Sequence, residues 1–165
     1  MAASDAIDHV LVVITLAAAL GCGLIAGVFF AFSTSVMKAL GRLAPGQSIA
    51  AMQSIIIVIL NPWFLGVFLG TGAVCAVAVV SSVWGWGRPG AVYRLVGGTL
   101  YLAGSVLVTR VFNVPRNDAL ASVAPQDARA ADVWAGYVGG WTAWNHVRAA
   151  ASLAAAASFS LALAS

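Results

Sequence analysis

The stretch from Trp134 to Leu163 reads WAGYVGGWTAWNHVRAAASLAAAASFSLAL, and Arg148 is its only charged residue. It exceeds the roughly 20 apolar residues that a helix needs to cross the hydrocarbon core of a membrane. A charged side chain is costly at such a place and usually marks a function. The stretch therefore predicts a membrane helix that carries a polar site.

The whole chain has the composition of an integral membrane protein. Of its 165 residues, 62% are hydrophobic and 8% are charged, whereas about one-quarter are charged in a soluble domain. The net charge of +3 comes from scattered basic residues and not from a basic stripe, which argues against nucleic-acid binding. All anionic residues are aspartates outside the long apolar runs, so no carboxylate within the membrane is expected as a catalytic base or proton relay.

The two cysteines, Cys22 and Cys75, lie in apolar surroundings with no CxxC motif and no neighbouring His. We expect buried free thiols that pack as small hydrophobic side chains. The spacing predicts neither a disulfide nor a zinc site.

Four apolar segments are long enough to cross a membrane. They cover about residues 10–32, 49–83, 91–112 and 134–163, and Pro62 lies inside the second. No Lys or Arg precedes the first segment, so we expect a retained helix and not a cleaved signal. Small residues are frequent and let helices approach closely in lipid. These features predict a single all-α domain, an antiparallel four-helix transmembrane bundle.

Positive charge predicts the orientation of this bundle. The loops 34–48 and 113–131 contain an excess of Lys and Arg over the loop between the second and third segments. By the positive-inside rule these two loops face the cytoplasm and both termini lie outside. A bacterial inner membrane is the expected location, with membrane lipid as a partner, and homo-oligomerisation is left open.

Unusual polar and aromatic residues gather at one face of the expected bundle. In an antiparallel arrangement, the first segment ends where the second and fourth begin and the third ends. The residues near these points are Phe29, Phe32, Gln53, Asn61, Asn113, Asn117 and the run from Trp141 to Arg148. Because four separate segments contribute, we interpret this face as a binding site.

Helical periodicity sorts the residues of the fourth segment. With a rotation of about 100° per residue, one stripe contains Trp134, Tyr137, Trp141, Trp144, Asn145 and Arg148. A flat apolar ligand could stack on the indoles while the amide and guanidinium bind its oxygens. His146 is the natural candidate for a catalytic base because His titrates near neutral pH. Its helical direction, about 140° from Trp141, turns it away from the stripe.

Structural roles are an alternative for each of these residues. Arg148 lies near a membrane boundary, where Arg side chains snorkel and Trp and Tyr form interfacial belts. Amides also hold bundles together, at about 0.6 kcal/mol each. The run from Asn113 to Asp118 has the composition of a turn.

At these residues the chain resembles the anthrone oxygenase-like family of small bacterial and fungal membrane proteins, also called the domain of unknown function 1772 family. The resemblance covers most of the chain and rests on GVFFAFSTSVM (Gly27–Met37), AMQ (Ala51–Gln53), LNPWF (Leu60–Phe64), NVPRNDAL (Asn113–Leu120) and W..Y...W..WNHVR (Trp134–Arg148). The family often has an Asn shortly after AMQ, where this chain has Ile55, Ile56 and Ile57. If that amide binds substrate in relatives, the substrate here differs or is absent.

The resemblance implies a monooxygenase that converts an anthrone, or another electron-rich polycyclic aromatic polyketide, with O2 as co-substrate and no metal or flavin cofactor. The sequence agrees, since it has no HExxH, no facial metal triad and no glycine-rich nucleotide loop. We expect Arg148 and Asn145, helped by Asn113 or Gln53, to hold the enolate oxygen. Trp141 and Trp144 would stack on the rings, and the base is unassigned.

Three other classes of function stay open at this point. A non-catalytic membrane module would hold a quinone, a lipid or a protein partner. A transporter is disfavoured because no Asp, Glu or Lys inside a span could couple ions. A metal enzyme is disfavoured because no ligand set is recognisable.

Overall fold

The structure, a computed structural model, describes the backbone of residues 2–165 and the side chains of residues 6–165. Within this range the chain is helical and contains no strand, which confirms the all-α prediction. The elements are α1 (Ala2–Ala31), η1 (Phe32–Val36), α2 (Met37–Leu40), α3 (Pro45–Ile59), α4 (Pro62–Trp84), α5 (Ala91–Tyr101), η2 (Leu102–Leu107), η3 (Thr109–Asn113), α6 (Val114–Ala121) and α7 (Ala130–Leu163). The three η elements are π-helical turns inside longer helical rods.

Four helical segments of this described range are long and apolar enough to cross a membrane. They are Ala6–Leu40, Pro62–Trp84, Ala91–Ala121 and Ala130–Leu163. Their outer surfaces expose large aliphatic side chains, such as Leu20 on α1 and Leu153 on α7, which suits contact with lipid tails. These helices suggest an integral membrane protein, while the side on which the termini lie stays a prediction.

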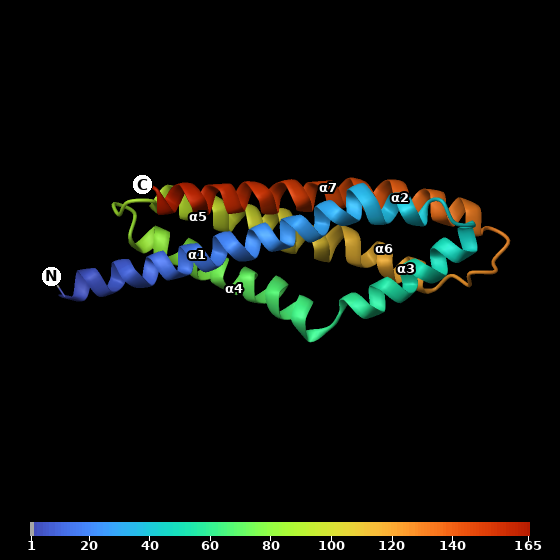
Figure 1. Cartoon of the computed structure of the whole chain (residues 1–165), viewed down its shortest axis with the longest axis horizontal. Coiled ribbons are helices and arrows are strands. Elements are labelled where there is room, and N and C mark those ends of the chain that lie inside the picture. Colours follow the sequence, from blue (N-terminus) through green and yellow to red (C-terminus); the bar gives the residue numbers. More distant parts are fainter. Residues whose placement is uncertain (1) are drawn as a thin grey trace.

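The four long helices pack as a ring. α1 contacts α7 and α4, and α5 contacts the same two helices. Successive helices run antiparallel, so that α1 begins at the end of the bundle where α7 finishes (Figure 1). Close packing depends on small residues: a Cβ at Gly98 of α5 would lie 2.8 Å from the carbonyl oxygen of Cys75 in α4.

The core of the ring contains the two cysteines. Cys22 and Cys75 are buried free thiols, as predicted, and their sulfur atoms lie 3.8 Å apart between α1 and α4. Beside them, the Tyr101 hydroxyl donates to the carbonyl oxygen of Phe68 at 3.0 Å. This hydrogen bond joins α5 to α4.

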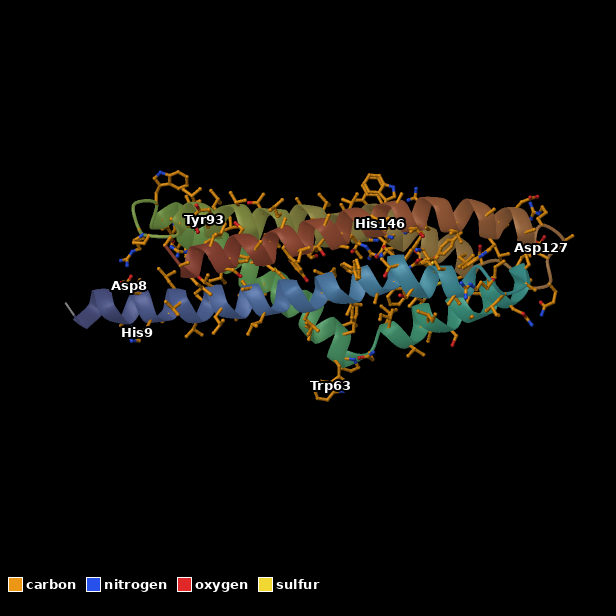
Figure 2. All side chains as sticks on the ribbon, turned by 45° about the horizontal axis from the view of Figure 1, so that its top comes forward. Asp8, His9, Trp63, Tyr93, Asp127 and His146 are labelled. Atoms are coloured by element: carbon orange, nitrogen blue, oxygen red, sulfur yellow. The ribbon has the colours of Figure 1, made fainter. Side chains whose placement is uncertain are left out.

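The predicted second segment, residues 49–83, is not a single helix. It divides at Leu60 and Asn61 into α3 and α4, which meet at a corner on one side of the bundle (Figure 1). Pro62 has no amide hydrogen and disfavours a helical residue before it, and Asn61 is accordingly extended. The Asn61 side chain caps α4 by accepting from the Phe64 amide at 3.0 Å. Trp63 points outward from this corner (Figure 2).

Most of the two stretches expected as loops, residues 34–48 and 113–131, is helical. η1 and α2 continue α1 as far as Leu40, and α6 continues the third helix as far as Ala121. Pro115 lies directly after the π-helical turn η3, at the start of α6, and does not interrupt this helix. The non-helical connections are therefore short, at residues 41–44 and 122–129.

Candidate functional site

α7 buries one face along its whole length. The buried residues recur every three or four positions and include Trp134, Tyr137, Trp141, Asn145, Arg148, Ser152 and Phe159. Trp144 lies at the edge of this face and stacks on Phe112, with ring centroids 3.5 Å apart. His146 is exposed on the outer surface of α7 (Figure 2), in the direction that helical periodicity indicates.

Arg148 is the centre of a buried polar network. The residue is 5% exposed, and its Nη2 donates to Asn145 Oδ1 at 2.6 Å while Nη1 donates to Thr109 Oγ1 at 3.1 Å. Its Nε has no partner, and no carboxylate of the described residues lies within 4.0 Å of the guanidinium. A buried charge without a counter-ion is unfavourable, so this site favours the binding of an anion.

Asn145 holds Arg148 in place. It is fully buried, and its Nδ2 donates to the carbonyl oxygen of Phe29 at 2.7 Å and to Ser33 Oγ at 2.5 Å. Both N–H groups of the amide donate to these two acceptors and its oxygen accepts from Arg148, so Asn145 has no free N–H for a ligand. Ser33 and Thr109 lie on the π-helical turns η1 and η3, and such turns are frequent at functional sites.

A cavity of about 110 Å³ opens beside this network. Its walls are mainly apolar side chains of α1, η1, α3 and α4, among them Phe29, Phe32, Ile56 and Phe68. The Arg148 guanidinium carbon lies 4.1 Å from the centroid of the Phe29 ring and 5.3 Å from that of Trp141. The cation is therefore held by aromatic faces, which attract positive charge.

Asn117 supplies a second polar group to the cavity wall. Its Oδ1 accepts from Trp141 Nε1 at 2.9 Å and from the Tyr137 hydroxyl at 3.0 Å. Because both neighbours donate, the oxygen of the amide must face them. No hydrogen bond of the Nδ2 group is seen within residues 6–165, and Asn117 is one of the residues that line the cavity.

Three other residues expected at the site hold the backbone instead. The Nδ2 of Asn113 donates to the Trp141 carbonyl oxygen at 3.2 Å. Gln53 donates to two carbonyl oxygens at and beyond the end of α6, both at 2.9 Å, and so ties α3 to α6. Asn61 caps α4 at the corner. The described lining of the cavity includes none of these three amides.

Thr109 was not among the residues singled out in the sequence. A lone Thr in an apolar helix ordinarily bonds a carbonyl one turn back, so its residue type gives no signal. Its spacing gives no signal either, because Asn113, four residues further on and on the same side of the helix, binds a backbone carbonyl and does not line the cavity.

The described side chains include no group of three or more His, Cys, Asp or Glu that could hold a metal ion. The cavity wall, as far as the chain is described, also contains no carboxylate and no imidazole. Arg148, Asn117 and Thr109 are therefore the side chains that can act on a ligand by charge or hydrogen bonding.

Fold and site together define a helical membrane protein with an aromatic cavity around a buried, unpaired cation. A family model described as Anthrone oxygenase matches residues 63–158, which is more than half of the chain. The chain therefore belongs to the anthrone oxygenase family, which confirms the resemblance seen in its motifs. The matched range contains Thr109, Asn117, Trp141 and Arg148, whereas α1 and α3, which complete the cavity, lie outside it. No curated protein and no solved structure matches the chain.

Proposed function

We propose that this protein is a membrane monooxygenase that binds the anion of an electron-rich polycyclic aromatic compound of the anthrone type and oxidises it with O2. Membership of the anthrone oxygenase family supports the oxygenase class. The observation that carries the choice of substrate is Arg148, a buried cation without a counter-ion at the wall of an aromatic cavity.

In the proposed reaction, an anthrone and O2 give an anthraquinone and water. The methylene carbon of the anthrone loses a proton, and the resulting anion passes one electron to O2. The two radicals combine into a peroxide anion, which takes a proton back from water to become a hydroperoxide. The hydroperoxide then loses water to leave the new carbonyl group. One oxygen atom enters the product and the other leaves as water, so the substrate supplies all the electrons and no cofactor takes part.

The protein contributes charge and position to this reaction. Arg148 stabilises the enolate oxygen, and such stabilisation is strong where water is excluded. Asn145 acts as a positioning residue, because it fixes the guanidinium through α1. Asn117 offers its Nδ2 group to a second oxygen of the substrate. Phe29 and Trp141 flank the Arg148 guanidinium, which faces the aromatic rings of the substrate.

The proton that the methylene carbon loses has no acceptor among the described side chains of the cavity wall. We therefore assign deprotonation to water, with the acidity of the phenolic or enolic substrate providing the anion. Arg148 then selects the anion from solution and shifts the equilibrium towards it. This assignment gives His146, on the outer surface, no part in the chemistry.

A tricyclic substrate needs more room than the cavity of about 110 Å³ provides, since pockets for drug-sized ligands occupy roughly 300 to 1,000 Å³. α3 is the wall suited to move. It is joined to α4 through a broken corner, and its cavity residues Ile55, Ile56 and Ile59 are half-buried. Outward movement of α3 would enlarge the cavity and would loosen the packing of Ile49 and Met52 on α7, while α1, α4, α5 and α7 keep their contacts with one another.

The deciding experiment is O2 uptake by the purified protein in lipid nanodiscs with 1,8-dihydroxyanthrone. Oxygenation predicts one O2 consumed per anthraquinone formed, at a rate well above that of empty nanodiscs. Because the cavity lining, within residues 6–165, contains no carboxylate and no imidazole, a non-catalytic module that holds a quinone or phenol is the alternative. That alternative predicts saturable quenching of Trp fluorescence by the anthrone with no O2 uptake above the blank.

A further inference from the structure

A second cavity surrounds a second buried arginine, Arg94, near the start of α5. It is lined by Asp8 and lies at the end of the bundle where α1 begins, the end at which Figure 2 labels Asp8 and Tyr93. The cavity measures about 240 Å³, and its polar lining comes from Asp8, Thr15, Arg88, Arg94 and Ser165. Nothing in the oxygenase chemistry proposed above uses this region.

Arg94 has unused hydrogen-bonding capacity although it is only 4% exposed. Its Nη1 donates to the carbonyl oxygen of Pro89 at 3.1 Å, whereas its Nε and Nη2 have no partner. No carboxylate of residues 6–165 lies within 4.0 Å of this guanidinium. Nε and Nη2 form the edge of a guanidinium that binds a carboxylate or phosphate through two parallel hydrogen bonds.

The neighbouring groups do not satisfy Arg94. Arg88, at the rim, is paired with the carboxylate of Asp8 at 2.5 Å. The hydroxyls of Thr15 and Ser165 donate to backbone carbonyl oxygens of their own helical turns. Among its side chains, as far as residues 6–165 describe them, the cavity contains one cation with a counter-ion and one without.

The turn before α5 encloses Arg94. Gly90 has a positive φ of 71°, a conformation that favours glycine. A Cβ there would lie 2.7 Å from the carbonyl oxygen of Ala162 and 3.0 Å from Arg94 Nη1. The turn thus packs against the end of α7 and covers the guanidinium. A snorkelling arginine would extend its charge into water, so snorkelling does not explain this arrangement.

The turn between α4 and α5 and the helix ends that flank it carry the exposed aromatic side chains of Trp84, Trp86 and Tyr93. Exposed Trp and Tyr are typical of the aromatic belts at the headgroup level of a membrane, so we infer that this end of the bundle lies at that level. The phosphates of membrane phospholipids lie at this level, and a guanidinium binds a phosphate through paired hydrogen bonds. We propose that the cavity binds the phosphate group of a phospholipid, with Arg94 as the main ligand and Arg88 at the rim.

The charge balance at the rim supports a singly charged phosphodiester. The carboxylate of Asp8 repels an anion, but its pairing with Arg88 offsets this charge and leaves Arg94 as the net positive group. A phosphodiester headgroup carries one negative charge and would balance it. Inorganic phosphate offers the same chemistry from a second source, and the experiment must separate the two.

The test uses the full protein in a neutral maltoside detergent and measures its thermal unfolding temperature, because a ligand that binds the folded state raises it. Three probes are compared: dihexanoyl phosphatidylglycerol, dihexanoylglycerol without phosphate, and inorganic phosphate. We expect the phosphatidylglycerol to raise the unfolding temperature and the dihexanoylglycerol to leave it unchanged. An equal shift with inorganic phosphate at the same concentration would overturn the assignment to lipid.

Arg94→Gln is the decisive variant and should weaken the apparent affinity for phosphatidylglycerol by about tenfold or more, the loss that follows from removing a charged hydrogen-bond donor. Arg110→Gln, which removes an exposed arginine elsewhere, is the matched control and should bind as the wild type does. Equal affinities for Arg94→Gln and wild type would overturn the proposal.

A measurement on the wild type keeps the test valid if Arg94→Gln does not fold. Native mass spectrometry should show one phosphatidylglycerol bound per chain in preference to an equal concentration of dihexanoylglycerol. Equal occupancy of the two lipids would show that the phosphate is not recognised and would overturn the proposal.

Discussion

The two buried arginines, Arg148 and Arg94, carry the same charge in contrasting surroundings. Arg148 donates to side chains of two helices and faces aromatic rings beside an apolar cavity. Arg94 donates to one carbonyl oxygen and lies in a polar cavity with a neighbouring ion pair. Both lack a counter-ion among the described residues, so both favour an anion. The difference between the walls is the reason why we propose a flat, delocalised anion beside Arg148 and a compact phosphate beside Arg94.

The sharpest test of this contrast is Arg148→Gln, which keeps a polar side chain and removes the charge. Loss of a preorganised group that stabilises a developing oxyanion lowers kcat by about 100-fold to 1,000-fold. We expect that loss in O2 uptake with 1,8-dihydroxyanthrone. Arg110→Gln is the control, because Arg110 is exposed next to Thr109, and it should retain turnover within about twofold, the scale of a surface substitution. Unchanged turnover in Arg148→Gln would remove the charge from the mechanism.

A counter-ion supplied by mutation should block the Arg148 site. Thr109 Oγ1 accepts from Arg148 Nη1, so Thr109→Asp places a carboxylate next to the guanidinium and occupies the position of the substrate anion. Thr109→Asn has nearly the same shape without the charge and is the matched control. We expect turnover of the Asp variant to be at least about tenfold below that of the Asn variant, since one charged contact contributes about 1.5 to 3 kcal/mol.

The same pair of variants separates blocking from misfolding. A paired charge is less costly to bury than an unpaired one, so Thr109→Asp should unfold at the same temperature as Thr109→Asn or higher. Lower stability together with lower turnover in the Asp variant would contradict the presence of an unpaired cation at Arg148.

The pH dependence should follow the substrate and not the protein. With no titratable base in the described cavity wall, kcat/KM should rise with pH as the fraction of substrate anion rises. For two anthrones whose pKa values differ by about one unit, the midpoints of the pH profiles of kcat/KM should differ by about the same amount. His146→Ala should leave both profiles in place. A midpoint shared by the two substrates would reveal a protein base.

Much of the fold is encoded locally and could be predicted. Hydropathy marks the spans, and the helical period identifies the buried face of α7 and the outward direction of His146. The break at Asn61 was also encoded, because an Asn before a Pro is a helix-start signal, but the continuous apolar run on both sides hid it. A helix break is therefore easily missed where the hydropathy on both sides predicts one continuous membrane span.

The details of the site depend on contacts between distant segments. Arg148 and Trp141 stand out in the sequence because charge and indole rings are rare in an apolar helix. The role of Asn145 could not be predicted, because the N–H groups of its amide donate to Phe29 and Ser33. These two residues lie on a distant segment of the chain. Gln53 has the residue type of a ligand contact, yet only the packing of α3 on α6 shows that its amide binds backbone.

The two cavities also differ in how firmly their walls are held, and Gln53 gives a way to measure this. The turn at Gly90 packs tightly on α7 around Arg94, whereas α3 is tied to α6 by the two hydrogen bonds of Gln53. Gln53→Leu removes both donors and leaves two carbonyl oxygens without their partner, which should lower stability by about 1 to 3 kcal/mol. Hydrogen exchange should accelerate in α3 and not in the turn before α5. Gln47→Leu, an exposed position on the same helix, is the control and should leave exchange unchanged. Equal acceleration at both cavities would show that α3 is not a separately mobile wall, and the substrate would then need another way to enlarge the site.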